Sequence, residues 1–103
     1  MSTRATIQFR DRNDTFYVYR HCDGFPEIIL PDIEKVIEQT RGRWSEPAVS
    51  LIVTSFIGMH FKPNERLPDY EITSGFHGDE SYRYLVKWDA DAKKWTAQVG
   101  TDL

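Results

Sequence analysis

Hydrophobic and polar residues alternate near the start of the chain. Ala5, Ile7 and Phe9 fall on one face of an extended segment and polar residues fall on the other, which is the period of two of a half-buried strand. The polar run at residues 11–14 supplies turn residues, and residues 15–20 are β-branched and aromatic. We therefore predict an antiparallel hairpin made of these two segments.

The spacing of apolar residues becomes helical after the Asp23-Gly24 turn. The text FPEIILPDIEKVIEQTRG places apolar residues on one face with charges between them. Pro31 lies inside this pattern and lacks a backbone donor, so we predict either a helix start or a kink at that residue. The helix should end at Gly42, because glycine suits the left-handed conformation that closes helices.

A second helix is predicted over residues 46–61, with Ser45 as its N-cap. This segment is apolar almost all round, which indicates burial on more than one side. Leu51, Ile52 and Phe56 should therefore be almost inaccessible to solvent. The β-branched content argues for strands instead, but the length without a turn signal favours a helix.

The rest of the chain is typical of strands. Residues 63–69 form a loop bracketed by two prolines, and three strand-like segments follow, at residues 70–73, 81–89 and 94–100. The predicted order is ββααβββ. The sequence thus predicts one α+β domain over residues 1–103, with a mainly antiparallel sheet and two helices packed on one face.

Composition narrows the functional classes. A content of 40% hydrophobic residues among 103 is too high for a disordered chain, and a single cysteine cannot form an internal disulfide. We expect a cytoplasmic protein with no membrane partner, since no signal-peptide or membrane-spanning pattern is found. A net charge of −3 argues against a nucleic-acid partner. A local basic patch remains an alternative, because Arg41 and Arg43 flank Gly42.

Metal and nucleophile sites find little support in the spacing of residues. His21, Cys22, His60 and His77 offer zinc-binding side chains, but their separations match no compact zinc pattern. We therefore expect no metal or other cofactor, and we interpret His60 as a core histidine bonded to a backbone carbonyl. The loop SGFHGDES contains serine, histidine and aspartate, but no nucleophile elbow precedes a helix there.

Two loops concentrate the polar chemistry of the chain. YRHCDGFPE follows the second predicted strand, and GFHGDESYRY leads into the fourth. If both loops lie at one end of the sheet, their side chains would form a single polar pocket with Tyr19, Phe25 and Phe76 as aromatic lining. The candidate binding residues are Tyr19, His21, Asp23, Glu27, His77, Asp79 and Glu80. The alternative is that these residues serve turns and the helix start.

The segments YVYRHCDGFPE, RGRW and LPDYEITSGFHGDESYRYLVKWD carry a resemblance. The chain is similar over nearly its full length to a family of short uncharacterised bacterial and phage-associated proteins. That resemblance implies a mobile-element setting. It implies no activity, catalytic residue or cofactor.

These observations favour a non-enzymatic binding or protein-interaction module. Its partner would be an unknown protein or a second copy of the chain, which would make a homodimer. Tyr17 and Tyr19 should lie on an exposed aromatic face of the sheet, where they are candidate contact residues. The alternative function is a small hydrolase or metal-dependent enzyme. Its chemistry would reside in the His21/Asp23 and His77/Asp79 loops.

Overall fold

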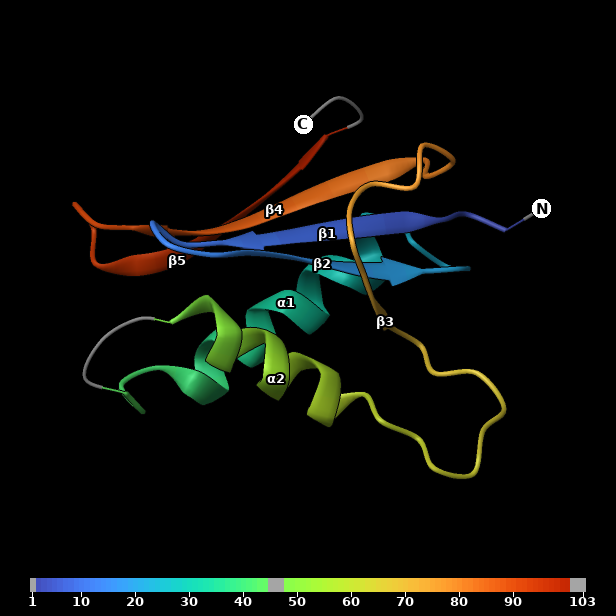
Figure 1. The fold of residues 1–103 in the computed structure, drawn as a ribbon, viewed down its shortest axis with the longest axis horizontal. Helices are drawn as coiled ribbons and strands as arrows, with labels where there is room; N and C mark the ends of the chain where they lie inside the picture. The colour runs from blue at the N-terminus through green and yellow to red at the C-terminus, as the bar shows by residue number, and fades with distance from the viewer. Residues whose placement is uncertain (1, 45–47, 101–103) are drawn as a thin grey trace.

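A five-stranded sheet forms one layer of the protein and two helices form the other (Figure 1). The computed structural model describes residues 2–44 and 48–100. Its elements in chain order are β1 (Ala5–Arg10), β2 (Thr15–Arg20), α1 (Pro26–Thr40), α2 (Val49–Met59), β3 (Glu71–Thr73), β4 (Tyr82–Asp89) and β5 (Lys94–Gly100). The α+β class, the order ββααβββ and the packing of both helices on one face are confirmed.

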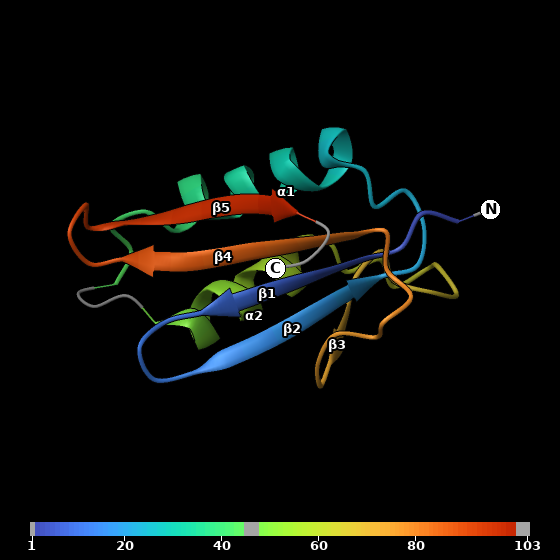
Figure 2. The same cartoon turned by 90° about the horizontal axis from the view of Figure 1, so that it is seen from above.

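The strands lie in the order β3-β2-β1-β4-β5, and Figure 2 shows the face of the sheet that the helices leave uncovered. Neighbouring strands are antiparallel except for β1 and β4, which run parallel. The parallel pair arises because the chain passes through both helices before it returns beside β1. Ile7 lies in β1, the central strand of the sheet, and is aligned with Val18 of β2 on one side and with Tyr84 of β4 on the other.

The hydrophobic core lies between the sheet and the helices. Phe56 of α2 is fully buried, and its ring lies 5.4 Å from that of Phe9 and 4.6 Å from that of Tyr70. The expected burial of Ile52 and Phe56 is confirmed, but that of Leu51 is wrong, since it is 38% exposed. The reason is that α2 rests on its neighbours through one face only, and Leu51 lies off that face.

Helix α1 begins at Pro26, which occupies the first turn. Pro31 lies inside the helix, and its missing N–H would have bonded the carbonyl four residues earlier, so one helical hydrogen bond is lost there. The predicted start or kink at Pro31 is therefore replaced by a start five residues earlier. The predicted end is confirmed, with Gly42 at φ 70°.

The start of helix α2 is held by a residue far away in the sequence. The predicted N-cap Ser45 and first residue Glu46 lie outside the described residues, and the helix of the structure starts at Val49. The Val49 amide donates to the Asp11 carboxylate at 2.8 Å. The same carboxylate accepts from two amides of the β1–β2 turn. Asp11 thus closes the turn and caps α2 at once.

Candidate functional site

Tyr19 is the centre of the two-loop corner, by which we mean Tyr19 and the side chains of residues 21–27 and 76–80 around it. Its ring points away from the helices, and the connection between β3 and β4 passes over it. His77 from that connection stacks on the ring at 3.7 Å between centroids, and His21 meets its edge at 4.8 Å. The Tyr19 hydroxyl donates to Asp79 at 3.0 Å. Both loops therefore meet at one end of the sheet.

The outer groups of this corner are paired with each other. His21 Nε2 lies 2.8 Å from a Glu71 oxygen, and His77 Nε2 lies 2.9 Å from the Thr73 hydroxyl. Glu71 and Thr73 alternate along β3 and face the same side of the sheet as Tyr19. The Asp79 carboxylate also lies 3.3 Å from the Arg4 guanidinium. Each imidazole is thus held between the Tyr19 ring and a side chain of β3.

Glu80 is the most enclosed carboxylate at the corner, with a side chain only 1% exposed. It accepts hydrogen bonds from Arg83 Nε at 2.8 Å, from the Thr6 hydroxyl at 3.0 Å and from the backbone amides of His77 and Gly78. Burial acts to raise the pKa of Glu80, but these donors outweigh it and the pKa is lowered. Glu80 therefore fixes the loop that carries His77 and Asp79.

Two of the predicted corner residues do not join the cluster. Asp23 adopts a left-handed conformation at φ 57° in the turn before α1, and Glu27 lies in the first turn of that helix. Gly24 between them packs so closely on β1 that an added Cβ would lie 2.7 Å from the Ala5 Cβ. The Tyr84 hydroxyl donates to the Gly24 carbonyl at 2.7 Å. This part of YRHCDGFPE therefore leads the chain across the sheet end into α1.

The aromatic lining also differs from the expectation. Phe76 does lie at the corner, where it meets the edge of the Tyr17 ring at 5.2 Å and the Arg83 guanidinium at 4.1 Å. Phe25 lies 6.4 Å from Tyr82 instead, on the helix side of the sheet. The expectation that Tyr19 is an exposed contact residue is wrong, because the β3–β4 connection covers it and leaves it 2% exposed.

Acid-base chemistry at the corner is limited by these contacts. Burial, followed by the hydrogen bond to Asp79, raises the pKa of Tyr19, so the phenol stays protonated at neutral pH. In the described part of the chain, no three His, Cys, Asp or Glu side chains gather in a way that would hold a metal ion. Some groups of the cluster are accessible to solvent, among them His21, whose side chain is 52% exposed, and Asp79 at 45%.

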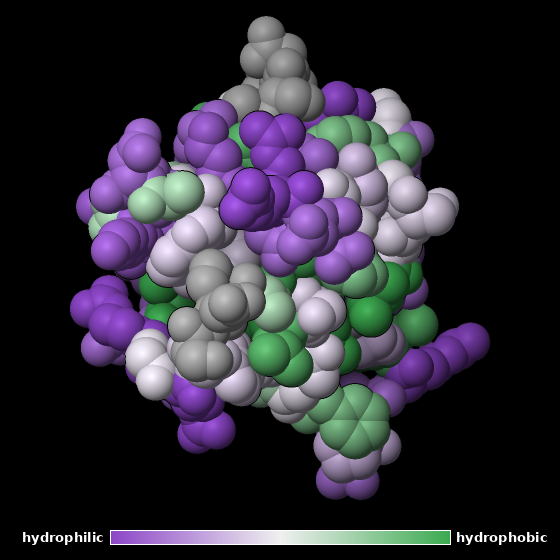
Figure 3. All heavy atoms as spheres, turned by 60° about the vertical axis from the view of Figure 1, so that its left-hand side comes forward, coloured by the Kyte–Doolittle hydropathy of each residue, from purple (hydrophilic) through white to green (hydrophobic). Residues whose placement is uncertain are grey.

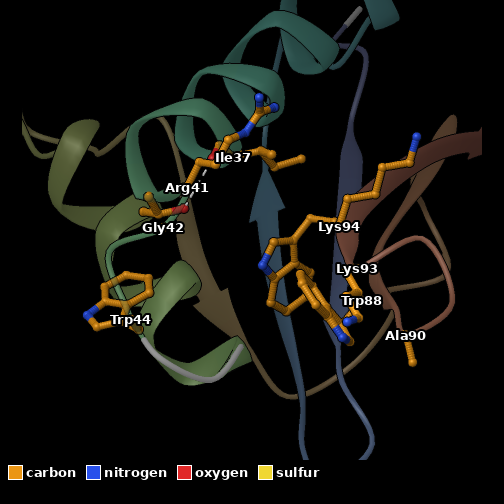
Figure 4. Close-up of a pocket in the computed structure, with 10 residues that line it drawn as sticks. Ile37, Arg41, Gly42, Trp44, Trp88, Ala90, Lys93 and Lys94 are labelled. Atoms are coloured by element: carbon orange, nitrogen blue, oxygen red, sulfur yellow. Dashed lines mark hydrogen bonds between the residues drawn. The ribbon is translucent and has the colours of Figure 1, made fainter.

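A groove at the opposite end of the sheet was missed by the sequence analysis. It has a volume of about 770 Å³ and lies between the end of α1 and the β4–β5 hairpin (Figure 4). All three tryptophans of the chain line it, namely Trp44, Trp88 and Trp95. We call this the tryptophan groove. Trp88 and Trp95 are opposite each other on β4 and β5, with their rings edge to face at 5.5 Å.

Basic side chains surround the tryptophan groove. Arg41 contributes from the end of α1, and Lys93 and Lys94 contribute from the hairpin, while none of the described residues that line the groove is acidic. Figure 4 shows Trp44 on one side and Trp88 with the two lysines on the other. Figure 3 shows that hydrophilic residues at this end of the molecule lie beside residues of intermediate hydropathy and apolar residues. The groove thus combines partly exposed indole surface with basic side chains.

Comparison with known proteins adds no neighbour from which function could be transferred: no family model, curated protein or solved structure matches the chain. The family resemblance of the sequence segments therefore stays an expectation. Among residues 2–44 and 48–100, neither helix has the length and apolar content needed to cross a bilayer.

Proposed function

We propose that this protein is a non-enzymatic binding module and that the tryptophan groove is its recognition surface. The observation that carries the proposal is the gathering of every tryptophan of the chain in one groove. Its volume falls within the range of about 300–1,000 Å³ that is usual for ligand sites. Tryptophan and arginine are also the residues that dominate the energetics of binding interfaces. Arg41 at the rim fits that pattern.

The two-loop corner supports binding less well. Its polar groups satisfy one another, as the pairs His21–Glu71, His77–Thr73 and Tyr19–Asp79 illustrate. A ligand that bound there would have to replace these hydrogen bonds, which costs free energy without adding new ones. The binding role of the corner residues stays a prediction.

A hydrolase or metal-dependent enzyme at the corner is the second candidate. It is favoured by one observation, the convergence of His21 and His77 on the same tyrosine. Against it, Asp23 does not join the group and the Tyr19 phenol is covered. Hydrolysis of model phosphate and carboxylate esters that is lost in a His21→Gln/His77→Gln variant would establish this candidate instead.

Two-dimensional NMR tests the binding function. The three indole N–H signals are assigned with single Trp→Phe variants, and the protein is titrated with panels of anionic, cationic and neutral ligands. We expect an anionic ligand to shift the indole signals and to leave the imidazole signals of His21 and His77 unchanged. Shifts confined to the imidazoles would move the site to the corner. A panel without effect on the indoles would contradict the proposal.

The cellular setting is part of the proposal and rests on the sequence. The single cysteine, Cys22, suits a reducing compartment and supports a cytoplasmic protein, and the segment resemblance supports a phage or prophage origin. A protein partner or a homodimer remains compatible with this setting. Sedimentation of the purified protein at several concentrations distinguishes the two.

A further inference from the structure

We propose that the tryptophan groove binds single-stranded nucleic acid, an inference that rests on the groove being the recognition surface. The first observation is an extension of the groove. A second hollow of about 480 Å³ adjoins it around the end of β4 and shares Trp88 and Ala90 with it. Arg10, Arg12 and Lys87 line this second hollow. Arg10 and Lys87 face the side of the sheet that the helices leave uncovered, so the cations continue from the indoles around the end of β4.

The distribution of charge gives the second observation. The two hollows together are lined by six of the 13 lysine and arginine residues of the chain. Asp11 is the single acidic residue among the described lining residues, and its carboxylate is occupied by the Val49 amide and the β1–β2 turn. An overall charge of −3 therefore coexists with a locally basic path, along which phosphates would be attracted.

Acidic residues of the neighbouring hairpin reduce this charge only in part. Asp89 directs its Oδ1 to the amides of Asp91 and Ala92, in the turn between β4 and β5. Asp91 is exposed in the same turn. Lys93 and Lys94 balance these two carboxylates and Arg41 is paired with Glu38 at 3.1 Å, so the excess of positive charge comes from Arg10, Arg12 and Lys87.

The arrangement of the indoles indicates the class of anion. Trp44 lies across the groove from Trp88, so flat rings bound there would meet indole surface (Figure 4). Trp95, which also lines the groove, contacts the Trp88 ring. Bases of a single strand can stack on such rings while their phosphates follow the cations, whereas the bases of a duplex are stacked on each other and inaccessible. An acidic polypeptide would use the cations but has no flat ring at each anionic unit.

Fluorescence anisotropy of labelled oligothymidylate and oligouridylate tests the inference. We expect binding that weakens as salt is raised from 50 to 200 mM. Trp44→Leu should lower the affinity by roughly 5- to 150-fold, the usual effect of losing one stacked base. Arg10→Gln/Arg12→Gln should lower it and reduce the salt slope by about 1.4, which corresponds to two phosphate contacts.

A charge-matched variant provides the control. Lys35→Gln/Arg66→Gln also removes two exposed cations, but from residues that do not line either hollow, so it should leave the affinity unchanged. An equal loss in both double variants would overturn the inference. If polyglutamate shifts the indole signals and oligonucleotides do not, the inference is overturned and the binding function is retained. If neither polymer shifts them, the inference falls, and indole shifts from another ligand class would still support the binding function.

Discussion

Substitution of Glu80 by glutamine should destabilise the protein by about 2–4 kcal/mol. The side chain is 1% exposed and accepts from four donors, of which Arg83 is charged. An amide has one acceptor oxygen, so either Arg83 or the Thr6 and His77 donors lose their partner. A hydrogen bond to a charged group contributes about 1.5–3 kcal/mol, and an unpaired buried donor costs about 1–3 kcal/mol. Arg83 is 27% exposed and regains some hydration, which keeps the total below the sum.

The chain contains a matched control for this substitution. Glu38 and Arg41 form an ion pair at the same three-residue spacing, at 3.1 Å, but both side chains are about 70% exposed. Exposed pairs of this kind contribute little, so Glu38→Gln should change stability by no more than about 0.5 kcal/mol. Urea-induced unfolding at pH 7 measures both free energies. Equal effects of the two variants would refute the idea that Glu80 organises the β3–β4 connection.

The pH dependence of stability, measured for the wild type and for Glu80→Gln, provides a second test. The pKa of Glu80 is lowered in the folded state from its ordinary value of 4.5, so the folded protein binds fewer protons at this group. The stability that the carboxylate contributes is therefore complete above about pH 4.5 and is lost as the pH falls through the folded-state pKa. The free-energy difference between the wild type and Glu80→Gln should shrink in that window. A difference that stays constant down to pH 3 would contradict the assignment.

Three further predictions concern other contacts. Asp11→Ala should cost about 0.5–2 kcal/mol in urea unfolding, because the Val49 amide and the turn lose their cap; an unchanged midpoint would contradict this. Tyr84→Phe should cost about 1–3 kcal/mol by leaving the buried Gly24 carbonyl without a donor, and a neutral effect would show that it finds another. Burial lowers the pKa of His60, so stability should decline as the pH falls below 6.5, and His60→Gln should reduce that decline; equal declines would refute it.

Strand positions and the helix layer could be predicted from the sequence because they depend on local patterns. The alternation of residues 5–10 and 15–20 gave both strands with their bounds, and Gly42 marked the end of α1. The cap of α2 could not be predicted, since Asp11 is 38 residues from Val49 and the contact exists only once the layers have packed. The parallel pairing of β1 and β4 depends on the same long-range packing.

The hydrogen bond expected from the His60 ring to a backbone carbonyl is not found in the part of the chain that the structure describes. The sequence analysis assigned it a backbone carbonyl, but its Nε2 is buried without a hydrogen-bond partner among the described residues. Its ring instead lies against Phe56 at 4.8 Å and Tyr70 at 4.9 Å. Aromatic packing at the end of α2 thus determines its surroundings, and this follows from tertiary contacts that no spacing rule contains.

The candidate sites differ in how much of their chemistry faces solvent. Polar residues made YRHCDGFPE conspicuous, and the structure joins His21 and Tyr19 to His77, but each group then bonds a neighbour. The tryptophans were unremarkable in the sequence because Trp88 and Trp95 alternate as core residues do, and Trp44 follows a helix end. Their grouping requires the β4–β5 hairpin to meet the end of α1. Binding depends on groups that remain available after folding, and by that criterion the groove is the better site.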